Sequence, residues 1–267
     1  MICFPSAKIN IGLQVVSRRA DGYHNLESVF YPIAIKEALE VVESDELSFT
    51  SSGLVIPGTA DSNLCLKAYR LLAADFRLPP VHIHLHKHIP IGAGLGGGSA
   101  DAAFFLHLMN DKFELGLSVE QLESYAGALG ADCPFFIQNK PAFASGIGDQ
   151  LQPISLDLSA YFLVLVTPDV HISTAEAYRG VKPAIPTYSL HESIQKPVSE
   201  WKKFISNDFE KHLFEAYPQL RALKSSLYEA GAMYASMTGS GSSVYGIFEA
   251  PIILPNLEKE AQVFYGV

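Results

Sequence analysis

A glycine-rich segment carries the clearest chemical signal in the sequence. Residues 90–101 read PIGAGLGGGSAD, and five of the seven positions from Gly92 to Gly98 are glycine. Glycine lets backbone amides approach a ligand closely and adopts positive φ without strain. Between a strand and a helix, such amides and the helix dipole together attract an anion. We predict that this segment binds phosphate groups; the alternative is a flexible turn or a close-packing site.

The common phosphate loops do not fit this segment. Gly92, Gly94 and Gly97 satisfy G-x-G-x-x-G, but a dinucleotide site also needs an acidic residue after the next strand, about 20 residues on. That region, 111–118, instead predicts the end of one helix and the start of another. A P-loop needs Gly-Lys-Ser/Thr, whereas Gly98 is followed by Ser99 and Ala100. We therefore expect a third type of ATP loop.

The composition indicates a folded, acidic protein. The chain has 267 residues, 48% hydrophobic and 18% charged, with a net charge of -9 and a pI of about 5.4. This length suits one large or two ordinary domains. Nucleic-acid binders usually carry a basic face, so a nucleic-acid partner is disfavoured. The acidic surface is compatible with a monomer or a homodimer.

The cysteines and the apolar segments give further expectations. Cys3, Cys65 and Cys133 are widely spaced and odd in number, which disfavours a disulfide framework or a zinc knuckle. Neither a secretory signal nor an uninterrupted apolar run of about 18 residues is present. We therefore expect a cytoplasmic protein with reduced thiols and no membrane partner.

Strand and helix patterns are intermixed without regular alternation, which favours an α+β fold over a doubly wound sheet. Apolar alternation or buried apolar runs predict strands at 7–16, 28–34, 38–43, 81–86, 160–167 and 243–248, the last being the final strand. Helical spacing predicts a first helix at 62–76, with Asp61 or Ser62 as its cap, and a second at 99–110. A third helix is predicted to begin after its cap residue Ser118. One or two further helices are predicted at 208–230, with a break near Pro218. Residues 18–25 predict a turn, and Pro153 marks a plausible domain boundary.

The segment PIGAGLGGGSADAA resembles the signature loop of the GHMP kinases. The blocks PSAKINI at 5–11 and MTGSGSS at 237–243 fall where that family has its other motifs. The resemblance implies a two-domain fold with the active site in the cleft between the domains, here 1–153 and 154–267. It also implies ATP as the phosphoryl donor and a small hydroxyl-bearing acceptor.

Two further blocks, ADGYH at 20–24 and LGADCPFF at 129–136, are similar to those of one branch of this family. The branch phosphorylates a cytidine diphosphate-linked methylerythritol in the non-mevalonate route to isoprenoids. The sequence departs from the pattern at Ala100, where relatives often have serine, and at Asp101, where asparagine is common. The loop amides do not depend on these side chains, so we expect ATP binding to survive.

The resemblance implies catalytic roles for two residues. Asp132 is the candidate base for the attacking hydroxyl, although an aspartate before Cys-Pro is more often a cap or turn residue. Lys8 is the candidate that orients Asp132 and offsets developing negative charge; the alternative is an exposed strand lysine. Asn10, two residues along the same strand, would face the same way.

Aromatic residues are the candidates for recognising the cytosine. Tyr23 can stack on a base and His24 can hydrogen-bond its polar edge, whereas a DGYH turn in isolation is more often structural. Tyr178 occupies the place of a second stacking aromatic, with a helix-core position as the alternative. Thr174 is expected to cap that helix, to contact the substrate, or to do both.

Other residues are expected to contact the nucleotide or the transferring phosphate. Lys87 reaches the nucleotide or is a solvated strand-end lysine, and Asn63 contacts the adenosine or serves a helix N-terminus. Ser99 is a candidate for binding phosphate or Mg²⁺; the metal is expected with ATP, but its protein ligands are not apparent. The full predicted ATP set is Pro90, Ile91, Gly92, Ala93, Gly94, Leu95, Gly96, Gly97, Gly98, Ser99, Asn63 and Lys87. The C-terminal motif adds Thr238, Gly239, Ser240 and Gly241 as substrate-binding residues.

His82, His84, His86 and His88 recur with a period of two. They predict either a polar, partly solvated strand face or, less readily, a zinc site.

Three other functions remain as alternatives. Another GHMP kinase acting on homoserine or mevalonate would have no use for a base-stacking aromatic pair. A nicotinamide-dependent oxidoreductase lacks the acidic partner of the glycine fingerprint. A nucleotide-binding module without enzymatic activity would not depend on Asp132.

Overall fold

The computed structural model of the chain describes residues 1–59 and 61–267 and the backbone of residue 60. It forms two compact units, each built from several segments. The first unit comprises 1–7, 35–91 and 96–140, and the second comprises 8–34, 92–95 and 141–267. The domains predicted at 1–153 and 154–267 divide the chain at one point in the sequence. The two compact units do not test that boundary, so it stays a prediction.

The sheet of the first unit has the strand order β1-β4-β6-β5. Its strands are β1 (Ile2–Cys3), β4 (Ala38–Glu43), β6 (Val81–Lys87) and β5 (Ser48–Gly53). Strand β4 runs antiparallel to β6, while the edge strand β5 runs parallel to it. The strands predicted at 38–43 and 81–86 are thereby confirmed.

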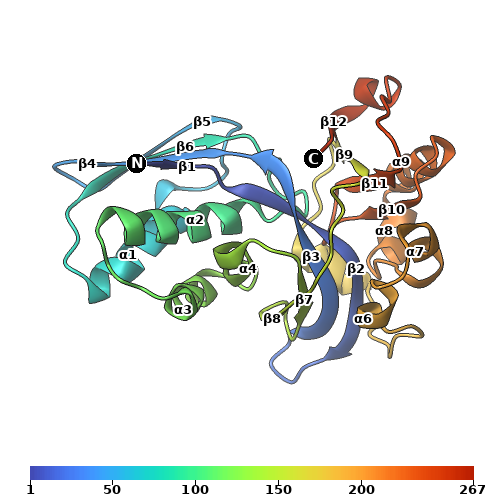
Figure 1. Cartoon of the computed structure of the whole chain (residues 1–267), viewed down its shortest axis with the longest axis horizontal. Helices are drawn as coiled ribbons and strands as arrows, with labels where there is room; N and C mark the ends of the chain where they lie inside the picture. Colours follow the sequence, from blue (N-terminus) through green and yellow to red (C-terminus); the bar gives the residue numbers. More distant parts are fainter. The chain divides into compact units, whose positions relative to one another are not determined.

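Helices cover one face of this sheet, as Figure 1 shows for α1 and α2. They are α1 (Leu64–Asp75), α2 (Gly97–Lys112), α3 (Val119–Leu129) and α4 (Cys133–Gln138), with a 3₁₀ turn at Ala60–Ser62. The predicted caps of α1 were wrong: Asp61 and Ser62 lie inside that turn, and the side chain of Asn63 accepts the Cys65 amide instead. Ser118 caps α3 as predicted, in a capping box with Gln121.

The second unit contains strands of two sheets. One has the order β2-β3-β7-β8, with β2 (Ser6–Arg18), β3 (His24–Lys36), β7 (Ala142–Ser145) and β8 (Gln150–Pro153). The other is antiparallel throughout and has the order β10-β11-β9-β12, with β10 (Tyr234–Met237), β11 (Val244–Phe248), β9 (Phe162–Pro168) and β12 (Ala261–Tyr265). The strand predicted at 243–248 is therefore not the final one. Strand β12 lacks a clear sequence alternation and owes its conformation to its pairing with β9.

Short helices complete the second unit. They are α5 (Thr174–Gly180), α6 (Leu190–Ser193), α7 (Val198–Phe204), α8 (Glu210–Ala216) and α9 (Pro218–Glu229), with a 3₁₀ turn at Leu257–Lys259. Pro218 begins α9 because its missing N–H is harmless in a first turn, which confirms the predicted break. Apolar side chains of β2, β9, β10, β11, α8 and α9 form the core of this unit, including Leu13, Val15, Val164, Val166, Leu213, Leu220, Leu227, Met237 and Val244. In the described part of the chain, no helix combines the length and apolarity needed to cross a membrane.

The histidines of β6 form a hydrogen-bonded ladder with hydroxyls of β5. The order along the ladder is Ser48, His82, Thr50, His84, Ser52 and His86, and each step is 2.9 to 3.0 Å. Val81, Ile83 and Leu85 on the other face are buried. The polar-face interpretation is thereby confirmed for His82, His84 and His86, whereas His88 lies just beyond the end of β6. The ladder joins the parallel edge strand to its neighbour.

We expect the variant Thr50→Val to be less stable than the wild type. Thr50 lies between two imidazoles, and valine keeps its shape and β-branching but neither hydrogen bond. The loss should be about 0.5–1.5 kcal/mol of unfolding free energy, measured by urea denaturation. Thr50→Ser, which keeps the hydroxyl, is the control; equal stability of the valine variant and the wild type would show that the ladder contributes nothing.

Candidate active site

Three sequence motifs meet within the second unit. The Lys8 amide donates to the carbonyl of Leu95 at 3.0 Å. The Thr238 hydroxyl donates to the carbonyl of Gly94 at 3.1 Å and accepts the Asn10 amide at 2.9 Å. Strand β2, the middle of the glycine loop and the C-terminal motif are thus joined by one backbone hydrogen bond and by the Thr238 hydroxyl, although they are far apart in the sequence.

The side chain of Lys8 is buried in this junction. Its Nζ donates to Asn10 Oδ1 at 2.5 Å and lies 4.8 Å from the centre of the Phe30 ring. Asn10 Nδ2 in turn donates to the Ser28 hydroxyl at 2.8 Å, and the Tyr245 hydroxyl donates to the Asn10 carbonyl at 3.0 Å. The predicted shared orientation of Lys8 and Asn10 is confirmed, and the alternative of an exposed strand lysine is wrong, because Lys8 is only 4% exposed.

The loop needs glycine at positions where another residue would be strained. Gly92, Gly94 and Gly96 have φ of 69°, 78° and 71°, in the left-handed region that side chains rarely adopt. A Cβ on Gly94 would also lie 2.1 Å from the carbonyl oxygen of Thr238. The close approach of the loop to the C-terminal motif therefore excludes any larger residue at this position.

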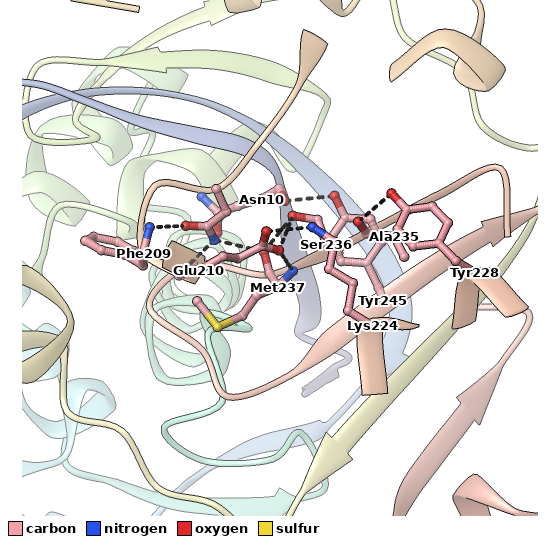
Figure 2. Close-up of polar contacts among 11 residues, drawn as sticks. Asn10, Phe209, Glu210, Lys224, Tyr228, Ala235, Ser236, Met237 and Tyr245 are labelled. Carbon is pink, nitrogen blue, oxygen red and sulfur yellow. Dashed lines mark hydrogen bonds and ion pairs between the residues drawn. The ribbon is translucent and has the colours of Figure 1, made fainter. Parts of the chain in front are cut away.

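The C-terminal motif is held by the segment that begins α8, as Figure 2 shows for Glu210. Asn207 Nδ2 donates to the carbonyls of Met237 and Gly239, each at 2.9 Å. Glu210 accepts the Met237 amide at 2.8 Å and the Lys224 ammonium at 2.6 Å. Asn207 and Glu210 were not among the predicted residues, because polar residues at a helix start are common and belong to no motif in this sequence.

The remaining residues predicted in the C-terminal half have modest contacts. Ser173, not Thr174, caps α5 by accepting the Glu176 amide, so the predicted cap was wrong by one residue. The Thr174 hydroxyl lies 3.5 Å from that of Ser240. Gly239 and Gly241 have positive φ of 54° and 86°, which allows the motif to turn back after Thr238.

The predicted base-recognition residues lie in the second unit, and two of them are in contact. The rings of His24 and Tyr178 stack with their centroids 5.0 Å apart. Tyr178 also packs edge-on against Phe209 and against the core, as its helix-core alternative predicts, and its stacking on a base stays a prediction. Tyr23 is 62% exposed and presents an aromatic face.

In the first unit, the glycine loop leads into α2. Pro90 and Ile91 precede the loop, and Gly96, in the left-handed conformation, occupies the N-cap position. The helix begins at Gly97, two residues before the predicted start, because the loop ends at that left-handed residue. The first amides of a helix have no intrahelical acceptor, so those of Gly97, Gly98 and Ser99 suit an anion. The Ser99 hydroxyl is hydrogen-bonded to the Cys133 thiol.

Asp132 lies in a turn and occupies the N-cap position of α4, without a hydrogen bond between its side chain and the helix amides. The cap-or-turn alternative therefore describes its backbone position, and its role as the base stays a prediction. Cys133 follows it in the first turn, and burial raises the pKa of this thiol to about 11. The Ser99 contact with Cys133 links the start of the phosphate helix to the residue beside Asp132 within one unit.

The structure decides the simpler alternatives for Lys87 and Asn63 in opposite directions. Lys87 is buried rather than solvated, and its ammonium lies 2.8 Å from Glu37 and 2.7 Å from Asp101. Its burial had a signal in the sequence, because Lys87 continues the period-two apolar face of Val81, Ile83 and Leu85. Asn63 serves as the cap of α1, and its contact with adenosine stays a prediction. Among the described residues, no group of three His, Cys, Asp or Glu side chains could hold a metal ion.

The sequence matches the GHMP kinases N terminal domain over residues 63–140 and the GHMP kinases C terminal domain over residues 190–263. It is 55% identical over 251 residues to a 4-diphosphocytidyl-2-C-methyl-D-erythritol kinase from Parabacteroides distasonis, covering 94% of this chain and 93% of the relative. It is 54% identical over 265 residues to the kinase of the same name from Bacteroides fragilis, covering 98% and 97%.

Solved structures agree with these relatives. A crystal structure of 4-(cytidine 5'-diphospho)-2C-methyl-D-erythritol kinase superposes with a TM-score of 0.87 at 30% identity, covering 100% of this chain and 98% of the other. A mevalonate kinase superposes with a TM-score of 0.73 at 15% identity, covering 99% and 98%; the second likeness concerns the fold alone. The predicted α+β, two-domain family fold is confirmed.

We expect Gly94→Ala to bind ATP at least about tenfold more weakly, because the new methyl forces the loop away from Thr238 and a misplacement of about 1 Å is costly at such sites. Calorimetric titration with a non-hydrolysable ATP analogue measures the change. Gly127→Ala in helix α3, where the nearest atom is 3.9 Å from the new methyl, is the control. Unchanged affinity in Gly94→Ala would contradict the loop assignment.

Proposed function

The chain belongs to the GHMP kinase family and is a kinase, and from this premise we propose that it transfers the γ-phosphoryl group of ATP to the 2-hydroxyl of 4-diphosphocytidyl-2-C-methyl-D-erythritol. The observation that carries the proposal is the junction of the three motifs at Lys8, Gly94 and Thr238 in a chain more than half identical to kinases of that name. The product would enter the non-mevalonate route to isoprenoids.

Phosphoryl transfer depends mainly on positioning and on stabilising charge. The loop amides from Gly94 to Ser99 hold the ATP phosphates at the start of α2. Asp132 accepts the proton of the attacking hydroxyl, and the oxygen forms its bond to the γ-phosphorus as the bond to the β-phosphate oxygen breaks. Lys8 offsets the negative charge that develops; its burial supports this role, because a charge in a low-dielectric setting acts more strongly than one in water.

The acceptor is distinguished by its cytosine. Tyr23, His24 and Tyr178 hold the base by stacking and by hydrogen bonds to its polar edge. The contact of His24 with Tyr178 supports this assignment, since two of the three predicted rings are already side by side. Thr174 and the segment Thr238–Gly241 complete the substrate set, with Thr238 acting through Asn10 and Gly94 because it is fully buried.

Magnesium accompanies ATP in this proposal. Mg²⁺ is usually bound by substrate phosphates, water and one or two protein groups rather than by a full protein cage. The absence of a metal-binding cluster among the described residues fits this mode, and the Ser99 hydroxyl at the start of α2 is the candidate protein ligand. When bound, the ion neutralises charge on the phosphates.

The acceptor assignment is tested by ADP release in a coupled assay with ATP and magnesium. We expect turnover with the cytidylated methylerythritol and none with uncytidylated methylerythritol, homoserine or mevalonate. Chelation of magnesium by EDTA should abolish the activity. Turnover of one of the smaller acceptors would retain the kinase and refute the cytosine assignment.

We expect Asp132→Asn to lower kcat by about 10²–10⁴-fold, the usual range for losing a general base. Affinity for ATP should stay near the wild-type value, because the loop amides hold the phosphates. Rapid-quench turnover and analogue titration separate these effects. The matched control is the exposed Asp111→Asn; a kcat for Asp132→Asn as high as that of the control would refute the base assignment.

A further inference from the structure

A buried ionic triad lies beside the start of α2 in the first unit. Lys87 Nζ lies 2.8 Å from both carboxylate oxygens of Glu37 and 2.7 Å from Asp101 Oδ2. The side chains of the three residues are 4%, 0% and 4% exposed. Charges so deeply buried are costly unless they are paired. Loss of any one of the three groups would therefore leave a buried charge without one of its partners.

The triad carries one positive and two negative groups. Burial, followed by the adjacent Glu37 carboxyl, raises the pKa of Asp101 well above its usual range. Burial acts to lower the pKa of the Lys87 ammonium, but the two carboxyls outweigh it and raise that pKa. The two carboxyls and the ammonium therefore depend on one another, because each would be costly to bury alone.

The triad contacts the chain on both sides of the loop. Before the loop, Glu37 Oε1 accepts the backbone amide of Ile89 at 2.9 Å. After it, Asp101 projects from the second turn of α2. The backbone of Gly97 packs between these points, since a Cβ there would lie 3.1 Å from Ile89 and 3.2 Å from Lys87 Nζ. The segment that enters the loop and the helix that leaves it are thus fastened to one ammonium.

We propose that Glu37, Lys87 and Asp101 form a positioning clamp that holds the first amides of α2 where they bind the ATP phosphates; this rests on the proposed kinase function. Lys87 acts through the loop and does not contact the nucleotide. Glu37 gives the sharpest test of the clamp. Its side chain is fully buried and belongs to no sequence motif, yet it bonds both Lys87 and the Ile89 amide before the loop. Preorganised donors bind an anion without a cost of ordering at the moment of binding.

The test compares single and triple variants by titration with a non-hydrolysable ATP analogue. Glu37→Gln keeps the shape but removes the charge that pairs with Lys87, and we expect its dissociation constant to rise about tenfold as the loop amides lose their fixed positions. Asp101→Asn keeps an acceptor for Lys87 and should recover most of the affinity that Asp101→Leu loses. The ion pair of Glu43 and Lys112 in the same unit, whose side chains are 61% and 18% exposed, provides the control Glu43→Gln/Lys112→Met, with wild-type affinity expected.

A single Lys87→Met variant would leave two buried carboxyls without a cation and is at risk of not folding. The triple variant Glu37→Gln/Lys87→Met/Asp101→Asn has no buried charge and keeps the volume of the site, so we expect it to fold and to bind the analogue about tenfold or more weakly. Wild-type affinity in the triple variant would overturn the proposal. It would also be overturned if affinity falls only in variants that lose Lys87, since Lys87 would then contact the nucleotide directly.

Hydrogen exchange without nucleotide separates the clamp from general stability and from the proposed function. We expect faster amide exchange in Glu37→Gln to concentrate in residues 90–99, with α3 unchanged. Acceleration spread evenly over the first unit would mean that the triad only stabilises the fold, and would overturn the proposal. Failure of the wild type to bind the ATP analogue would instead refute the kinase function, while the exchange pattern would still test the clamp.

Discussion

The close approach of the glycine loop to the C-terminal motif is the constraint on which the second unit depends. At Gly94 the two backbones are so near that even one added methyl would collide with the carbonyl of Thr238. The Thr238 hydroxyl uses this proximity to bond both the loop and strand β2. Segments separated by more than 140 residues thereby present their polar groups together, and the buried Lys8 is placed by the same contacts.

Buried polar groups on both units are kept in place by buried partners. In the second unit, Asn207 and Glu210 accept or donate to the backbone of the C-terminal motif. In the first, Glu37 and Asp101 surround Lys87 beneath the start of α2. Each arrangement uses a charged or amide side chain to hold a backbone segment in place. Rigid support of this kind suits an enzyme whose chemistry depends on positioning rather than on covalent intermediates.

Much of the site was predictable because local patterns carry it. The glycine spacing, the alternation of β6, the Ser118 cap and the break at Pro218 each follow from short-range backbone preferences. Errors occurred where a neighbouring element decided the outcome. The cap of α1 moved to Asn63 because a 3₁₀ turn occupies the preceding residues, and β12 was missed because its partner β9 supplies its hydrogen bonds. The burial of Lys87 was readable from its place on an apolar period-two face, but its partners were not.

By itself, the sequence determined the kind of chemistry. A loop of five glycines before a helix suits phosphates, because glycine has no side chain to block the backbone and the first helix amides are left without an acceptor. It also determined the family, through three motifs in order. Only the tertiary structure decided which side chains those motifs depend on. Glu37, Asn207 and Glu210 are unremarkable in sequence, and they matter because folding removes them from water next to groups that need a partner. That pairing is set by distances between residues remote along the chain, which no local pattern contains.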